Sequence, residues 1–116
     1  SAGYYDAYYR KAMQVRTLIA GDFRRVFSSG VHALFTPTTP TPAFAFGAKS
    51  DPYEMYLSDI FTCTANLAGV PALSMPIGRV GKLPVGGQLI APHFQEQRMF
   101  DVAVVLERAL GSEAHQ

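Results

Sequence analysis

The sequence has a single cysteine, no tryptophan and no apolar run close to the ~20 residues that span a bilayer. The lone thiol, Cys63, excludes an intrachain disulfide and a cysteine-based zinc cluster. The formal net charge of +1 excludes the strong positive field of an autonomous nucleic-acid-binding domain. Apolar residues make up 48% of the 116 residues, which is enough for a hydrophobic core. The composition therefore predicts a soluble globular chain with no membrane partner.

Familiar catalytic motifs are also missing. The glycines form neither a P-loop nor a dinucleotide-binding loop, and the serines lack the G-x-S-x-G elbow. His32, His93 and His115 do not have the spacing of metal ligands. A nucleophilic pair of Cys63 with His32 or His93 would need a coincidence of the fold that the sequence does not indicate. We therefore expect no catalytic residue, no metal ligand and no cofactor site in this chain.

One central segment carries clear start and stop signals for a helix. Asp51 is suited to cap a helix N-terminus, Pro52 to occupy its first position, and Gly69 to end it in the left-handed conformation. These signals predict a helix over residues 52–68. Its apolar face has the i, i+3, i+4 spacing of a core-facing stripe: Leu57, Ile60, Phe61, Thr64, Ala65 and Ala68.

Asp59 is the acidic residue that this pattern does not explain. It lies roughly 200° from Leu57 on a helical wheel, and residues 53–69 contain no lysine or arginine to pair with it. A helix with so small a polar face is expected to be covered on both sides, which would leave Asp59 partly buried. Two interpretations remain open: a solvated or structural ion-paired carboxylate, or recognition of a ligand's ammonium group.

The remaining patterns predict a layered α/β unit. The strands after the central helix are expected to be antiparallel neighbours, with Pro76 at a sheet edge or strand end. The basic residues of the first helix are better explained as a solvated face than as a nucleic-acid contact. A sheet this thin is expected to have helices on both faces and further strands upstream. The expected elements are helices over residues 4–29, 52–68 and 95–110, strands over 31–36, 72–77 and 85–91, and a proline-rich crossing over 37–50.

The chain resembles the C-terminal part of the amidase-signature enzymes, and among them the A subunits of tRNA-dependent amidotransferases. The segments that carry the resemblance are YYDAYYRKAMQVRTLI, LFTPTTPTPAF, DPYEMYLSDIFT with NLAGVPALSMPIG, and LPVGGQLIAP. It implies that residues 1–116 are the C-terminal part of one larger amidase domain, with helices packed on a mixed β-sheet that is incomplete here. The departures are His32, where the family usually has Asp, and Gly87, where an aliphatic residue is usual and strand packing is expected to be slightly weaker.

The resemblance also implies a function. In the family, two serines and a lysine hydrolyse an amide such as glutamine, and all three lie in an N-terminal part that these residues do not contain. Ammonia then passes to a partner subunit that acts on charged tRNA, so the implied partners are the missing N-terminal part and subunits B and C, with ATP and magnesium only at the partner. Asp59, in YLSDIFT, matches the residue that holds the α-ammonium of substrate glutamine, and the arginine for its carboxylate would lie before Ser1.

Two alternative functions remain at this point. One is a stand-alone amidase-signature hydrolase of small amides, which would have no ammonium to bind. The other is a catalytically inert piece that acts only in packing and subunit contacts. The resemblance fits a bacterial cytoplasmic or an organellar protein, and the sequence does not distinguish these locations.

Overall fold

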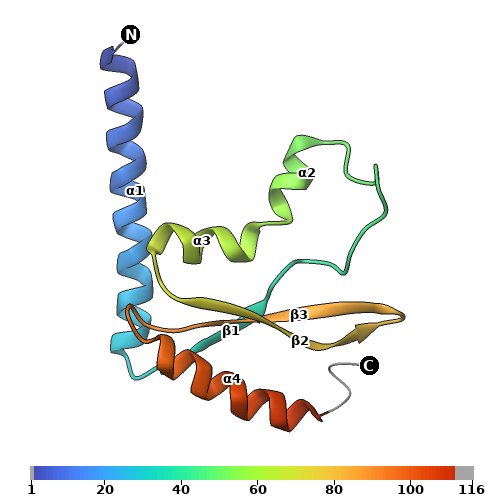
Figure 1. The fold of residues 1–116 in the computed structure, drawn as a ribbon. Coiled ribbons are helices and arrows are strands. Elements are labelled where there is room, and N and C mark those ends of the chain that lie inside the picture. Colours follow the sequence, from blue (N-terminus) through green and yellow to red (C-terminus); the bar gives the residue numbers. More distant parts are fainter. Residues whose placement is uncertain (1, 112–116) are drawn as a thin grey trace.

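The computed structural model describes residues 2–111, which form four helices and a three-stranded sheet (Figure 1). The strand order is β1-β3-β2, and the central strand β3 is antiparallel to both neighbours. In chain order the elements are α1 (Ala2–Ser28), β1 (Leu34–Pro37), α2 (Pro52–Leu57), α3 (Ile60–Ala68), β2 (Ala72–Val80), β3 (Leu83–Ile90) and α4 (Glu96–Leu110).

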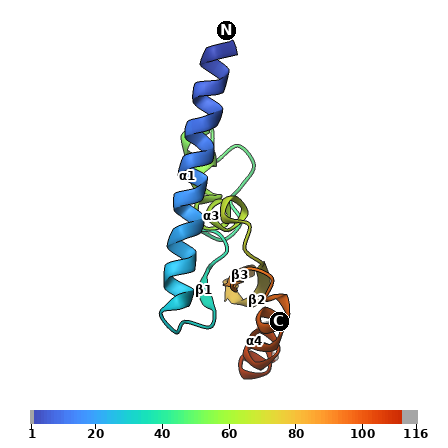
Figure 2. The same cartoon turned by 90° about the vertical axis from the view of Figure 1, so that its left-hand side faces the viewer.

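Helices lie on both sides of the sheet, as predicted. α4 packs on one face against β2 and β3, while α3 lies on the opposite side and packs against α1 (Figure 2). The side chain of Arg16 in α1 donates a hydrogen bond to the carbonyl of Leu67 in α3 at 2.7 Å. None of the residues of α1 is buried, so most of the apolar side chains of this helix are exposed to solvent or only partly covered.

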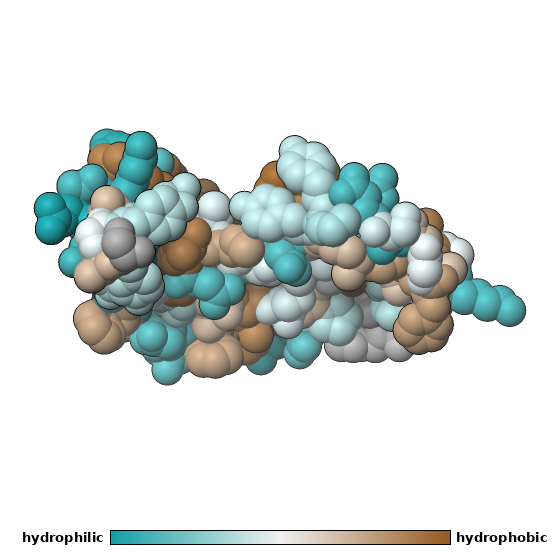
Figure 3. All heavy atoms as spheres, turned by 90° about the horizontal axis from the view of Figure 1, so that it is seen from above, coloured by the Kyte–Doolittle hydropathy of each residue, from teal (hydrophilic) through white to brown (hydrophobic). Residues whose placement is uncertain are grey.

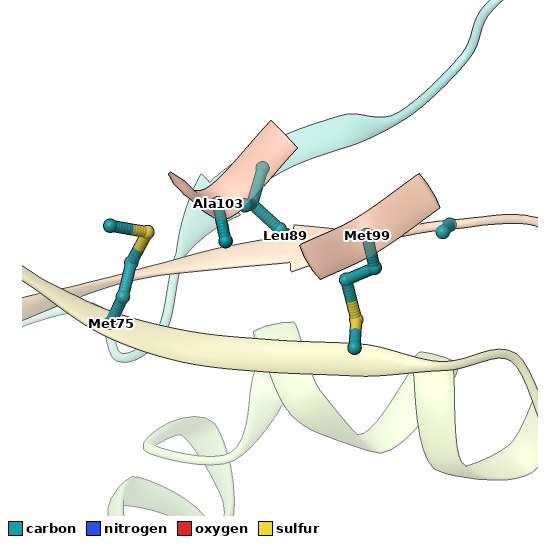
Figure 4. Packing of buried hydrophobic residues seen from close by; sticks show 5 residues of the cluster. Met75, Leu89, Met99 and Ala103 are labelled. Carbon is teal, nitrogen blue, oxygen red and sulfur yellow. The ribbon is translucent and has the colours of Figure 1, made fainter. Parts of the chain in front are cut away.

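The α4 side of the sheet holds the main apolar cluster, which consists of Met75, Leu89, Ala91, Met99 and Ala103 (Figure 4). Met75 and Leu89 come from adjacent strands, and Met99 and Ala103 come from successive turns of α4. The i, i+4 spacing of the two α4 residues places them on one helical face. The cluster thus joins the helix to two strands of the sheet.

β2 and β3 form a hairpin that is longer than expected. The turn consists only of Gly81 and Lys82, because Val80 pairs directly with Leu83. Gly81 has a φ of +61°, the left-handed conformation that glycine adopts without strain. β2 is an edge strand and its register shifts between Pro76 and Gly78, which confirms the expected edge position of Pro76.

The first strand begins later than predicted. β1 starts at Leu34 instead of Val31, so His32 lies before the strand and is exposed. The prediction of His32 as a strand residue was therefore wrong, because the apolar run VHALFT includes residues that only lead into the sheet. Gly87 also differs from expectation: a Cβ built there would lie 2.5 Å from the Phe35 ring and 2.8 Å from the Ile77 side chain. Those two side chains already occupy the space that an aliphatic residue would fill.

The described residues form an open, flat body. Its extents are 55 × 42 × 18 Å and its radius of gyration is 17.1 Å, against about 13 Å for a compact domain of this length. Figure 3 shows apolar groups at the surface over the α1 end and the α2 end of one face. Large side chains such as Tyr8, Leu18 and Ile60 are about half exposed or more. A chain with this much uncovered apolar surface is expected to pack against further protein.

Candidate functional site

The predicted central helix is divided into two, so the prediction of one unbroken helix over residues 52–68 was wrong. Ser58 and Asp59 separate α2 from α3. Their backbone N–H groups donate to Met55 and Tyr56, three residues back, and the Ser58 hydroxyl also donates to the Met55 carbonyl. Such i−3 bonds tighten the backbone and compete with the α-helical pattern. The apolar spacing alone gave no sign of this break.

Asp51 and Asp59 stand at the N-terminal ends of these two helices, but they differ in what their side chains do. The Asp51 carboxylate accepts a hydrogen bond from the backbone N–H of Tyr53 at 2.9 Å, which confirms the predicted cap. Asp59 has φ −101° and ψ 8°, and its carboxylate makes no capping hydrogen bond. The hydrogen bonds of Asp59 are made by its backbone: its N–H donates to the Tyr56 carbonyl, and its carbonyl accepts from the N–H groups of Thr62 and Cys63 and from the Thr62 hydroxyl.

The Asp59 carboxylate is thus available to a ligand. It is exposed within the described residues, which contradicts the expectation of partial burial, because no described element covers this side of α3. A carboxylate without an internal partner is suited to bind a cation such as an ammonium.

Beneath α3 the sheet carries a row of polar side chains. Thr36, Gln88 and Ser74 are paired across the three strands, so they lie in line on one face. Gln88 donates hydrogen bonds to the Thr36 hydroxyl at 3.0 Å and to the Phe61 carbonyl of α3 at 2.8 Å. The Ser74 hydroxyl is 2.7 Å from that of Thr38. This polar row joins the sheet to the helix that begins at Asp59.

Gly86 makes room for part of this network. A Cβ at this position would lie 2.9 Å from the Ser74 hydroxyl oxygen and 3.0 Å from that of Thr38. The absence of a side chain therefore lets these hydroxyls meet across the central strand. The polar row was not predicted from the sequence. The available signal was Gln88, a single polar residue in an otherwise apolar strand.

The other candidate residues do not come together as a reactive group. Cys63 is half-buried and forms no hydrogen bond with a histidine among residues 2–111. His93 lies against Gly69 and makes an edge-on ring contact with Phe94. It also lines a cavity of about 510 Å³ between α1 and the start of α4, together with Arg24 and Arg98.

Residues 2–111 contain no group of three or more histidine, cysteine or acidic side chains placed to hold a metal ion. Within the same range, no helix combines the length and apolarity needed to cross a membrane. His115, the third histidine considered from the sequence, lies outside the described residues.

The known proteins that the chain resembles in sequence include amidotransferase A subunits from several bacteria. The chain is 58% identical over 114 residues to the A subunit of glutamyl-tRNA(Gln) amidotransferase from Azorhizobium caulinodans, covering 96% of this chain and 23% of that protein. It is 61% identical over 104 residues to the corresponding protein of Pseudomonas putida, covering 89% of this chain and 21% of the relative.

Solved structures agree with these matches. The crystal structure of the corresponding Thermotoga maritima protein superposes with a TM-score of 0.85 at 46% identity, covering 92% of this chain and 24% of that one. The 6-aminohexanoate cyclic dimer hydrolase follows at a TM-score of 0.66 and 28% identity, covering 78% of this chain and 22% of that one. These neighbours confirm the predicted α/β amidase-signature fold.

The chain spans about a quarter of the length of the curated relatives it matches. The profile of the amidase family nevertheless matches residues 1–100, which is most of the chain. The matched range includes the sheet, the polar row and Asp59. The chain therefore belongs to the amidase family.

Proposed function

We propose that this chain is the C-terminal region of the glutaminase subunit of a tRNA-dependent amidotransferase. In this function, glutamine is hydrolysed to supply ammonia, which converts Glu-tRNA(Gln) to Gln-tRNA(Gln) or Asp-tRNA(Asn) to Asn-tRNA(Asn). The proposal is supported by identities of 53–61% to amidotransferase A subunits over most of the chain. The role of this region would be to hold the substrate while other residues break the amide bond.

The observation that carries the substrate role is the unengaged carboxylate of Asp59. Asp59 stands at a helix N-terminus, is exposed, and makes no capping bond, so its acceptor oxygens are free. The α-ammonium of glutamine offers three N–H donors and a positive charge, and a carboxylate binds such a group through charge-assisted hydrogen bonds. An arginine outside residues 1–116 would bind the α-carboxylate and complete the recognition of the amino acid.

The chemistry itself is assigned to residues outside this chain. We propose a nucleophilic serine, a second serine and a lysine in the N-terminal part of the same domain, so residues 1–116 alone would be inactive. The proposed partners are that N-terminal part and subunits B and C, with charged tRNA reached through a partner. ATP and magnesium would act only at the partner, and the setting would be the cytoplasm or an organelle.

The test is the substitution Asp59→Asn in the native protein that carries this chain. Loss of hydrogen bonds to a charged group costs about 1.5–3 kcal/mol, so we expect kcat/KM for glutamine to fall about 10- to 150-fold, mainly through KM. Hydrolysis of a small uncharged amide, which has no ammonium, should change little. Steady-state kinetics with both substrates measures the difference.

Asp51→Asn provides a matched control. It makes the same change of one carboxylate to an amide at the start of the preceding helix, where asparagine caps as well as aspartate. Glutamine kinetics should therefore stay as in the wild type. An unchanged glutamine KM in Asp59→Asn, with the protein folded and active, would contradict the recognition role.

The stand-alone amidase remains the second candidate, because the chain also resembles 6-aminohexanoate cyclic dimer hydrolase and another amidase of known structure. Those identities are 28–29%, below the values for the amidotransferase proteins. A hydrolase of neutral amides would show equal, small effects of Asp59→Asn on both substrates. Copurification with other amidotransferase components would separate the two functions independently of kinetics.

A further inference from the structure

Gln88 is the one polar side chain that is buried among the described residues, with 3% of its surface exposed. It lies in the central strand β3, on the face opposite Leu89 and the α4 cluster. Burial of an amide is costly unless its donors and acceptors are satisfied. The position therefore requires hydrogen-bond partners in the surrounding elements.

Those partners belong to two different elements. The side-chain nitrogen of Gln88 carries two N–H donors, and it lies 3.0 Å from the Thr36 hydroxyl of β1 and 2.8 Å from the Phe61 carbonyl of α3. One amide thus links the centre of the sheet to an edge strand and to a helix. An apolar group in place of the Gln88 amide would pack against α3, but it would not prevent the helix from shifting along its own axis.

Phe61 is in the first turn of α3, two residues after Asp59. The turn before it is the break at Ser58 and Asp59, so α2 does not continue the helix and hold this end rigidly. The other end of α3 is held by Arg16, which donates to the Leu67 carbonyl at 2.7 Å. The buried residues of α3 are Ala65, between these two hydrogen bonds, and Ala68, just after them; both side chains are small and give little resistance to sliding of the helix.

We propose that Gln88 is the positioning residue for Asp59: its hydrogen bond to the Phe61 carbonyl fixes the N-terminal turn of α3 and thereby the place of the Asp59 carboxylate. The inference rests on the proposed function for its effect on substrate, and on the hydrogen-bond geometry for its effect on α3. Gln88 does not contact the ligand; it acts on Asp59 through α3.

The first experiment measures the helix itself. Gln88→Leu keeps the approximate side-chain size and removes both N–H donors, and it is compared with wild type by hydrogen exchange of the native protein. We expect faster exchange of the backbone N–H groups of Thr62 and Cys63, which are the hydrogen-bonded N–H groups of residues 60–63, with the hairpin turn at residues 81–82 unchanged. Unchanged exchange in residues 60–63 would overturn the positioning role, whatever Asp59 binds.

The second experiment measures the substrate. Of the two hydrogen bonds that Gln88→Leu removes, only the one to the Phe61 carbonyl holds α3. Loss of that one neutral bond should raise KM for glutamine roughly 2- to 10-fold, with kcat less affected. Added to Asp59→Asn, the same substitution should have no further effect on KM, because the group that Gln88 positions is already lost. An equal rise in KM in both backgrounds would show a general structural effect and overturn the inference.

Thr36→Val is the matched control. It removes the hydroxyl that accepts from Gln88 and donates to the Pro37 carbonyl, and it leaves the bond from Gln88 to the Phe61 carbonyl, so glutamine KM should stay unchanged. The two proposals also fail in different ways. If Asp59→Asn leaves KM unchanged while Gln88→Leu still loosens residues 60–63, the substrate role is wrong and the positioning of α3 stands.

Discussion

The two faces of the sheet hold their helices by different interactions. On the α4 side, Leu89 and Met75 meet Met99 and Ala103 in an apolar cluster. On the α3 side, Gln88 and its polar neighbours hold a helix by hydrogen bonds, and the helix presents an unengaged carboxylate. Apolar packing is non-directional, whereas hydrogen bonds fix geometry. The difference indicates that one face supplies stability and the other supplies position.

The largest test of this difference between the two faces is a substitution at Leu89, which is 2% exposed. Leu89→Ala removes buried methyl groups from the α4 cluster and should lower the free energy of unfolding by about 2–5 kcal/mol. Glutamine KM of the folded protein should change little, because the Asp59 side of the sheet is untouched. Chemical denaturation and steady-state kinetics measure the two effects. Leu83→Ala, at a 43% exposed position of the same strand, is the control and should cost much less.

A smaller loss is expected from adding volume to the α4 side. Gly87→Ala would place its Cβ 2.5 Å from the Phe35 ring, and overpacking of this kind costs about 1–3 kcal/mol. Gly3→Ala is the contrasting control, because nothing lies within 4 Å of its added methyl group, and alanine in a helix should be neutral or stabilising. Partial recovery by the double substitution Gly87→Ala with Phe35→Leu would confirm the clash. Equal midpoints for Gly87→Ala and wild type would contradict it.

The smallest effect compares the two aspartates at helix N-termini. Asp51→Ala removes the capping bond to the Tyr53 N–H and should lower stability by about 0.5–2 kcal/mol. Asp59→Ala removes no capping bond, so stability should remain within about 0.5 kcal/mol of wild type. The denaturation midpoints of the two variants are compared with that of the wild type. A loss at Asp59 as large as that at Asp51 would mean that its carboxylate is engaged in the folded protein.

The elements themselves could be predicted well from local patterns. The helix expected over residues 95–110 corresponds to α4, and the Asp51 and Gly69 signals predicted where the central helical segment begins and ends. Gly69 has the expected left-handed conformation, with φ 71°. Such signals are local, since each depends on residues within a few positions in the chain.

The candidate site could be predicted only in part. Asp59 was identified as unusual because residues 53–69 lack a basic partner, but its position at a helix N-terminus and its exposure were not foreseen. The break before it depends on hydrogen bonds at Ser58 and Asp59 that compete with the helix, and apolar spacing does not report them. Gln88 was not recognised, because its partners are 27 and 52 residues away in the chain.

The sequence by itself determined the cap at Asp51, the left-handed end at Gly69 and the hairpin, because each follows from backbone preferences over a few residues. Membership of the amidase family also follows from the sequence, through the match over residues 1–100. Only the tertiary structure decided which strand faces are apolar or polar, and how the start of α3 is joined to Gln88. The reason is physical: register and long-range hydrogen bonds depend on which segments meet in space, and the local pattern of neither segment contains that information.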